Sequence, residues 1–247
     1  MTNQQDYENR IVAFFDILGY KNFINDTQYD LKKRKHLFGI MEYISNIQFD
    51  NEKGILALKD IGKEVSVFSD SIVISYPTNY PGCVFCTLID IIHIQNDLLG
   101  AGFLVRGGID IGPVYHNSNI IFGPAMVLAY EIESKCAIYP RIIVSDRVLN
   151  YGYNNPTPQN TQAYEIEAIN NLIRTDKDGL KFINNISQES EFDEGKYLDF
   201  ILKTKNLIEV GLLTIFEPSV KQKYEWLKEY YNSVIDSFTE QYKYLKV

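Results

Sequence analysis

The sequence predicts an α/β or α+β sandwich that ends in a helical C-terminal segment. Short apolar runs, some with the alternating apolar and polar residues of strands, are interspersed with longer segments. In these segments apolar residues recur every three or four positions, as in helices. Beyond Tyr197 only the helical spacing remains. The 247 residues suffice for one large domain or for one domain with an appendage, and no apolar run approaches the ~20 residues of a membrane-spanning helix.

Strand and helix signals alternate in the first half of the chain. An apolar run at residues 10–17 ends in an acid and predicts a buried strand, and helical spacing follows up to about residue 47. Residues 64–76 predict two strands joined by a turn, because valines and then isoleucines alternate with polar residues. Residues 81–99 predict a strongly apolar helix closed by glycines.

The alternation continues in the second half. A glycine-interrupted strand at residues 103–114 precedes a helix over 123–137, which a proline opens at a tolerated first-turn position. A short strand at residues 141–144 is followed by a surface loop over 151–162, rich in Asn, Pro, Thr and Gln. Residues 164–166 predict one more strand.

The end of the chain is helical throughout. Helical spacing resumes at Tyr197, and residues 221–245 predict one long helix. The chain therefore divides into a main domain at residues 8–190 and a helical C-terminal extension at 195–247, packed on the domain or on a dimer.

Composition narrows the functional classes. The net charge is -8 and the pI is near 5.0, so the chain lacks the broad basic surface of a nucleic-acid-binding protein, although a metal and a few donors suffice to hold one nucleotide. Three cysteines do not make a disulfide framework, and Cys83 and Cys86 are expected to be small core residues of a helix. The three histidines show no ligand spacing. With a polar N-terminus, these features predict a cytoplasmic protein.

Two acids stand at the ends of apolar strands, Asp16 and Asp70. A carboxylate there is costly to desolvate unless it is paired, hydrogen-bonded or bound to a cation. Two such carboxylates repel each other, and a divalent metal removes the conflict. Taken singly, either acid is more readily explained as a turn cap.

Four sequence segments, two of which contain these acids, resemble the motifs of class III nucleotidyl cyclases. They follow one another in the same order, between about residues 10 and 145. They are Phe-x-Asp-Ile-x-Gly-Tyr around Asp16, Val-Phe-Ser-Asp-Ser-Ile-Val-Ile around Asp70, a glycine-rich strand that begins at Leu104, and a helix that begins at Gly123. The resemblance implies an α+β fold with a ferredoxin-like βαββαβ core and a C-terminal helical extension. It also implies an activity, the conversion of a nucleoside triphosphate to its 3′,5′-cyclic monophosphate with release of pyrophosphate.

The same resemblance implies the metal and phosphate ligands. Asp16 and Asp70, both expected to be catalytic, would bind two Mg²⁺ or Mn²⁺ ions together with the carbonyl of Ile17. Backbone amides at the strand-to-helix turn would hold the β- and γ-phosphates, namely those of Leu18, Gly19 and Tyr20. Lys21 stands near the expected γ-phosphate position, and a solvated helix lysine is an equally good interpretation.

Other positions depart from the family pattern. The helix that normally supplies a transition-state Asn and Arg has Val127 and Glu131 there. The Lys and Asp that read adenine align with Ser66, still a candidate substrate contact, and with Ile120. The chain has therefore lost catalysis or uses a different arrangement for a different base.

Three shorter motifs resemble segments of the pyrimidine cyclases of bacterial Pycsar anti-phage systems. They are Val-Arg-Gly-Gly-Ile at 105–109, Ala-x-Tyr-Pro-Arg-Ile at 137–142, and Lys-Tyr-Glu-Trp-Leu at 223–227. Arg106 then contacts the base or the phosphates, or is a buried ion-pair partner. Weaker candidates for the missing cation are Lys135, Arg141 and Lys177.

The resulting prediction is a uridylate cyclase that takes UTP, with CTP as the less favoured substrate. The alternatives are a catalytically inactive, nucleotide-binding regulatory module and a purine cyclase. The resemblance further implies a homodimer with composite active sites, and a separate effector that binds the cyclic nucleotide in anti-phage defence. Nucleic acid and membrane are not expected partners.

Overall fold

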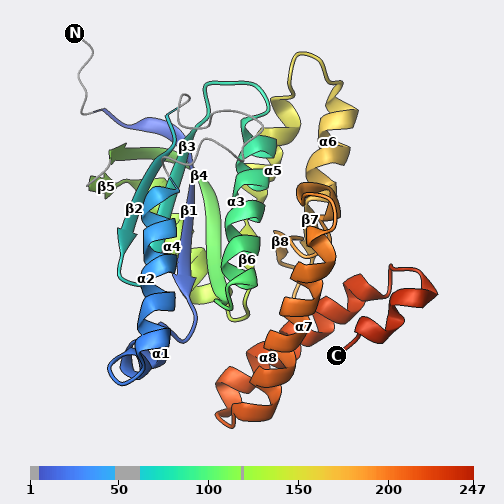
Figure 1. Ribbon diagram of the computed structural model, residues 1–247. Helices are drawn as coiled ribbons and strands as arrows, with labels where there is room; N and C mark the ends of the chain where they lie inside the picture. Colours follow the sequence, from blue (N-terminus) through green and yellow to red (C-terminus); the bar gives the residue numbers. More distant parts are fainter. Residues whose placement is uncertain (1–5, 48–61, 118–119) are drawn as a thin grey trace.

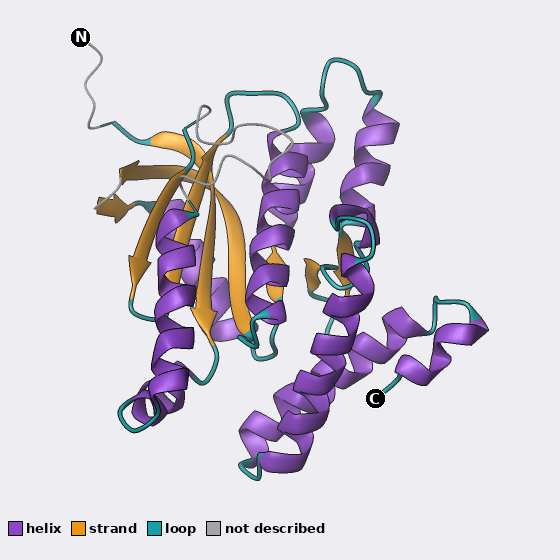
Figure 2. Cartoon of the chain, in the orientation of Figure 1, coloured by secondary structure: helices purple, strands orange, loops and turns teal. Residues whose placement is uncertain are grey.

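The computed structural model describes residues 6–47, 62–117 and 120–247, which form a mixed sheet with helices on both faces (Figures 1 and 2). Its strands are β1 (Glu8–Ile17), β2 (Glu64–Phe68), β3 (Ser71–Pro77), β4 (Val105–Asn117), β5 (Ile120–Phe122), β6 (Ile142–Val144), β7 (Ile173–Thr175) and β8 (Lys181–Ile183). They lie in the order β2-β3-β1-β4-β6-β8-β7, with β5 paired to β4. The β4–β6 pair is parallel and the other pairs are antiparallel.

The helices are α1 (Tyr20–Thr27), α2 (Leu31–Asn46), α3 (Cys83–Gly100), α4 (Pro124–Cys136), α5 (Asp146–Asn154), α6 (Gln162–Asn171), α7 (Lys196–Thr214) and α8 (Pro218–Ile235), with short 3₁₀ turns η1 (Glu189–Glu191) and η2 (Glu240–Leu245). From β1 to β4 the order is strand, helices, two strands, helix, strand. The predicted α+β fold with a βαββαβ core and C-terminal helices is therefore confirmed.

The alternation along β1 explains how the sheet divides the core. Ile11, Ala13 and Phe15 lie on the face covered by α2 and α3. Val12 and Phe14 lie on the other face, against two alanines of α4. Because side chains alternate along a strand, the next even position, Asp16, falls on the α4 side of the sheet.

Helix α3 forms the centre of the larger core. It is long and apolar enough to cross a membrane, but 67% of it is buried within the protein, as in the core helix of a folded domain. Cys83 is buried there and Cys86 is partly buried, and both thiols are free, in agreement with the sequence-based interpretation.

Helices α7 and α8 pack at the end of the sheet formed by β8 and β7, on the side of α3 (Figure 1). Their apolar side chains share a cluster with Phe182 of β8 and with Leu99 and Leu104. At the centre of this contact is Arg141, whose side chain is fully buried. It pairs with Asp176 and Asp178, and Trp226 of α8 donates to Asp176 over 2.7 Å.

The rings of Tyr139, Phe182 and Trp226 surround the Arg141 guanidinium, with centroids 5.4, 5.9 and 5.8 Å away. Tyr139 and Trp226 are stacked on each other, 5.5 Å apart. Planar cations are favoured between aromatic faces, so a single buried arginine joins the sheet to α8.

Three sequence predictions were wrong in part. Residues 164–166 belong to helix α6, because Thr161 caps the helix by accepting from the amide of Tyr164. The predicted loop at 151–162 begins later, since α5 continues to Asn154. The long C-terminal helix stops at Ile235, where Phe238 turns to pack on Tyr197 with ring centroids 6.0 Å apart.

Candidate active site

Asp16 and Asp70 meet where β1 ends beside the turn between β2 and β3. Asp16 is opposite Ser71 in the antiparallel register, and the amide of Ile17 donates to the carbonyl of Asp70 over 3.0 Å. This backbone bond holds the turn against the end of β1. The two acids that are far apart in sequence therefore come from adjoining backbone segments.

The turn that carries Asp70 is strained at the preceding residue. Ser69 has φ 58°, the one positive φ among the described non-glycine residues. A two-residue hairpin requires a positive φ at its first central position to match the twist of the strands, and glycine adopts it at least cost. In this hairpin a serine therefore holds the backbone conformation that glycine adopts at least cost.

Arg106 links the site to two acids. It lies opposite Asp16 on β4, and its Nε is 3.4 Å from a carboxylate oxygen of Asp16. Its Nη2 is 2.8 Å from Glu133 of α4, and its Nη1 donates to the carbonyl of Ala137 over 3.4 Å. The Glu133 side chain is only 4% exposed, so this arginine also compensates a buried charge.

The charges of the site act on one another. Burial raises the pKa of Asp16, the Arg106 guanidinium opposes this, and the charge of Asp70 adds to the rise. The pKa of Glu133 is raised for the same reasons, by burial first, against Arg106, and then by Asp16 and Asp70. Three acids therefore share one cation here, and the site has a surplus of negative charge.

A further cation comes from the C-terminal extension. Lys223 of α8 is half-buried and makes no hydrogen bond or ion pair with the residues that the structure describes. Burial lowers its pKa and the charge of Arg106 lowers it further, whereas Asp16 and Glu217 oppose the change. The helix is held over this region by the neighbouring contact of Gln222 with the Tyr139 hydroxyl, 3.5 Å. The charge of Lys223 is therefore coupled to those of Asp16 on β1 and Arg106 on β4.

The residues present fit a divalent cation held jointly with a ligand. Asp70 has no side-chain partner in the described part of the chain. A cation would offset both the burial and the repulsion from Asp70 that raise the pKa of Asp16. No group of three His, Cys, Asp or Glu side chains that could hold a metal occurs among the described residues. Two carboxylates and a carbonyl suffice only where substrate phosphates complete the coordination, as is usual for Mg²⁺.

The expected phosphate-binding turn lies at the start of α1. The amide of Leu18 donates to the carbonyl of Leu104 over 2.8 Å and is engaged in this structure. Gly19 has φ 77°, and a Cβ added at this position would meet open space, so the turn borders an accessible volume. The amides of Tyr20 and Lys21 start the helix, where no preceding helical carbonyl reaches them. The Lys21 side chain is exposed.

Ser66, the second expected substrate contact, is buried in a polar chain. Its hydroxyl lies 2.9 Å from Nε2 of His116, whose Nδ1 is 2.8 Å from the hydroxyl of Ser75. Arg10 donates to Ser75 in turn, over 2.8 Å. The role of Ser66 in binding a substrate stays a prediction, and its hydroxyl is already satisfied. Ile120 is 53% exposed on β5.

The weaker cation candidates lie elsewhere. Lys135 pairs with Glu131 on the outer surface of α4, and Lys177 pairs with Glu229 of α8. Arg141 is enclosed in the contact between the sheet and α8. The structure brings together Asp16, Asp70 and Arg106, and adds Glu133 and Lys223. Glu133 was missed because a glutamate on a helix is ordinarily solvated. Lys223 was not named as a site residue either, although it belongs to one of the three shorter motifs, at 223–227.

Exposed apolar side chains occur on β2, β5 and α4 and in the segment between α4 and β6. Large side chains there are about half exposed, between 48% and 57%: Phe68, Ile120, Phe122, Val127, Tyr130 and Ile138. Tyr130 packs edge-on against Phe14 of the sheet, with ring centroids 5.4 Å apart. Val127 and Tyr130, three positions apart on α4, are therefore both about half exposed to solvent.

Solved structures of nucleotidyl cyclases resemble this chain. The adenylyl cyclase CyaB from P. aeruginosa is 13% identical over 72% of this chain and 94% of its own, with a TM-score of 0.47. The guanylyl cyclase domain of the RhoGC fusion protein from the aquatic fungus Blastocladiella emersonii is 17% identical over 72% of this chain and 95% of its own, with a TM-score of 0.45.

A class III adenylyl cyclase-like ATP-binding protein from Pseudomonas aeruginosa is 11% identical over 66% of this chain and 40% of its own, with a TM-score of 0.43. These likenesses concern the arrangement of helices and strands, and the nucleotides in the names belong to those proteins. No protein-family model and no curated protein sequence matches the chain.

Proposed function

We propose that the chain is a metal-dependent nucleotidyl cyclase that acts on a pyrimidine nucleoside triphosphate, UTP before CTP. The observation that carries the proposal is the meeting of Asp16 and Asp70 at adjoining strand ends, with Asp70 unpaired among the described residues and the pKa of Asp16 raised. Such a pair is suited to a divalent cation, and two cations beside it, Arg106 and Lys223, suit a polyphosphate.

The residues of the chain then have distinct parts in the reaction. Asp16, Asp70 and the carbonyl of Ile17 would hold Mg²⁺ or Mn²⁺, which supplies charge neutralisation and a lower pKa for the ribose 3′-hydroxyl. The amides that start α1 bind terminal phosphate oxygens. Lys223 and Arg106 stabilise the charge that develops on the departing pyrophosphate.

The bond changes are those of an in-line displacement. The 3′-oxygen forms a bond to the α-phosphorus, and the bond from that phosphorus to the oxygen bridging the β-phosphate breaks. Pyrophosphate leaves, and the proton of the 3′-hydroxyl passes to solvent. In this scheme Lys223 replaces the transition-state arginine that Glu131 cannot supply.

The preference for a pyrimidine rests on the base-reading positions. Ser66 is hydrogen-bonded to His116, and Ile120 is apolar, so neither offers adenine the charged partners that the aligned positions supply in adenylyl cyclases. A site without such partners loses its discrimination in favour of adenine. The resemblance to the Pycsar enzymes adds the choice of UTP, a role in anti-phage defence and a separate cyclic-nucleotide-binding effector, in the cytoplasm.

We propose a two-fold dimer through the apolar face of α4 and β5. The side chains of Val127, Tyr130 and Phe122 on these two elements remain about half exposed to solvent in one copy. An isologous contact would bury the same face of both copies, and the expected composite sites would lie at its two ends.

A second candidate function is a nucleotide-binding regulatory module without catalysis. The ion pairs that Arg106 makes with Asp16 and Glu133 favour it, because they engage one of the proposed metal ligands. Val127 and Glu131 in place of transition-state groups point the same way.

One experiment separates these functions. Purified protein is incubated with each of the four nucleoside triphosphates and Mn²⁺, products are identified by mass, and binding is measured in parallel by calorimetry with a non-hydrolysable analogue. Cyclic UMP in excess over the other products supports the proposal, with the Asp70→Asn variant as the inactive control. Faster formation of cyclic AMP or cyclic GMP refutes the pyrimidine assignment, and binding without any product supports the regulatory module. Absence of both binding and product refutes both functions.

A further inference from the structure

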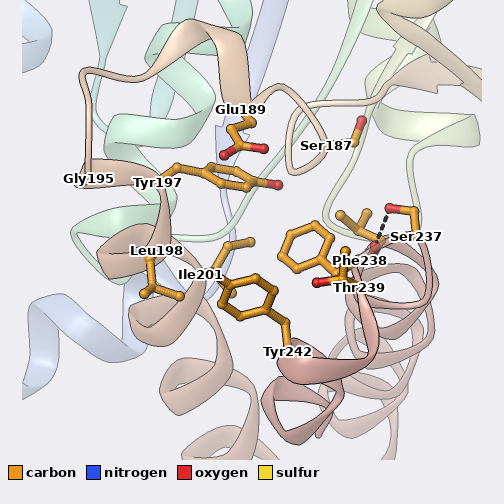
Figure 3. A pocket seen from close by; sticks show the side chains of 11 residues that line it. Ser187, Glu189, Gly195, Tyr197, Leu198, Ile201, Ser237, Phe238, Thr239 and Tyr242 are labelled. Carbon is orange, nitrogen blue, oxygen red and sulfur yellow. Dashed lines mark hydrogen bonds between the residues drawn. The ribbon is translucent and has the colours of Figure 1, made fainter.

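A cavity of about 450 Å³ lies between the C-terminal extension and the segment around η1, and its lining contains none of the residues of the candidate active site (Figure 3). Its walls come from the segment around η1, the start of α7, the end of α8 and η2. This volume is that of a small-molecule site. Nothing in the proposed cyclase reaction uses it.

Aromatic rings form much of the wall. Phe238 lies between Tyr197 and Tyr242, with ring centroids 6.0 and 6.2 Å away and interplanar angles of 50° and 85°. Rings at such angles do not stack on one another, so part of each ring face is exposed to the cavity, as Figure 3 shows. The π-faces carry partial negative charge. Leu198 and Ile201 complete an apolar floor.

The charge of the lining is negative and unbalanced. Glu189 is the one charged side chain among the lining residues, and its carboxylate has no hydrogen bond or ion pair with any described residue. In Figure 3 its carboxylate lies beside the ring of Tyr197, whose pKa is raised by burial and then by the charge of Glu189. Among the described residues, no Lys, Arg or His lines the cavity, so phosphates and other anions have no cationic partner there.

We propose that this cavity binds a compact organic cation, an ammonium group carried on an apolar or aromatic body. The ammonium would lie between Glu189 and the aromatic faces, gaining an ion pair and cation–π contacts. The body of the ligand would pack on Leu198, Ile201 and Phe238, and Thr239 offers a hydroxyl at the edge. This site is independent of the proposed cyclase activity.

In the test the full chain is titrated with benzylamine, and binding is monitored by calorimetry and protein NMR. Benzyl alcohol, which is neutral, and benzoate, which is an anion, serve as control probes of similar size. We expect saturable binding of benzylamine, at least about fivefold tighter than of benzyl alcohol, and none of benzoate. Glu189→Gln should weaken benzylamine binding by about fivefold or more, and Tyr242→Leu by about threefold. Glu194→Gln, an exposed acid of the same segment outside the cavity, is the matched control and should leave binding unchanged.

Circular dichroism verifies that each variant is folded, and Glu189 is exposed, so its substitution leaves the core intact. Benzoate or benzyl alcohol binding as tightly as benzylamine would overturn the proposal. So would equal benzylamine affinity in Glu189→Gln and wild type, or no saturable binding of benzylamine in the millimolar range.

Discussion

Lys223→Gln removes the cation that the extension contributes to the candidate active site. The ammonium is half-buried, makes no ion pair within the described residues, and is close enough to Asp16 and Arg106 for their charges to affect its pKa. A hydrogen bond between charged partners contributes about 1.5–3 kcal/mol. Its loss should therefore lower kcat/KM for UTP by about 10- to 150-fold, toward the lower end because the side chain is partly solvated.

The assay measures initial rates over a range of UTP concentrations, so that kcat and KM are obtained separately. Lys221→Gln, an exposed lysine of the same helix, is the control and should behave as wild type. Because the pKa of Lys223 is lowered, its positive charge is lost at a lower pH than in an ordinary lysine. The kcat/KM of wild type should therefore fall on the alkaline side, whereas Lys223→Arg should keep its charge and its activity there.

The reasoning is refuted if Lys223→Gln and Lys221→Gln give the same kcat/KM within a factor of about two. If the wild-type chain forms no cyclic product, the same variants are compared by calorimetric affinity for a UTP analogue. An unchanged affinity then refutes the role of Lys223 by itself, while the missing product refutes the cyclase.

Three other predictions test the site and the assembly. Asp16→Asn and Asp70→Asn should each abolish turnover in a folded protein. Because burial raises the pKa of Asp16, its ionised form costs stability, so metal-free Asp16→Asn should melt at a higher temperature than wild type at pH 7. This difference should disappear as the pH falls through that pKa and wild-type Asp16 becomes neutral. Ser69→Gly should stabilise the chain by about 1 kcal/mol, or about 2–4 °C in Tm, without loss of turnover, and a lower Tm would contradict the strain assigned to the turn. Val127→Asp should place a charge in the proposed dimer interface and give monomers of low activity by light scattering, whereas an active dimer would exclude this face.

The core of the fold could be predicted from the sequence because its strands and helices have clear periodicity. The run that ends at Asp16 and the apolar helix α3 were both located closely. The strands β5, β7 and β8 were not predicted, since three residues are too few to show alternation, whereas β6, equally short, was predicted from its wholly apolar Ile-Ile-Val run. Residues 164–166 were assigned to a strand because an isolated apolar-polar-apolar triplet has no detectable helical period, and the Thr161 cap that starts the helix was overlooked.

The residues of the candidate site were likewise predicted only in part. Asp16 and Asp70 were found because acids that end apolar strands stand out in a sequence. Arg106 was left between a substrate contact and an ion-pair partner, and the structure gives it the ion pairs. That Glu133 and Lys223 approach the same point depends on how α4 and α8 pack, which no local pattern encodes.

The enclosure of Arg141 between the sheet and α8 has a consequence for how the chain unfolds. Detaching α8 would leave a fully buried guanidinium facing the gap that Trp226 had filled, and would also remove the indole donor from Asp176. The sheet and the extension are therefore coupled in free energy, even though the sequence divides them at about residue 190. Heating should accordingly produce one cooperative calorimetric transition, in which the helices that carry Lys223 are lost together with the strands that carry Asp16.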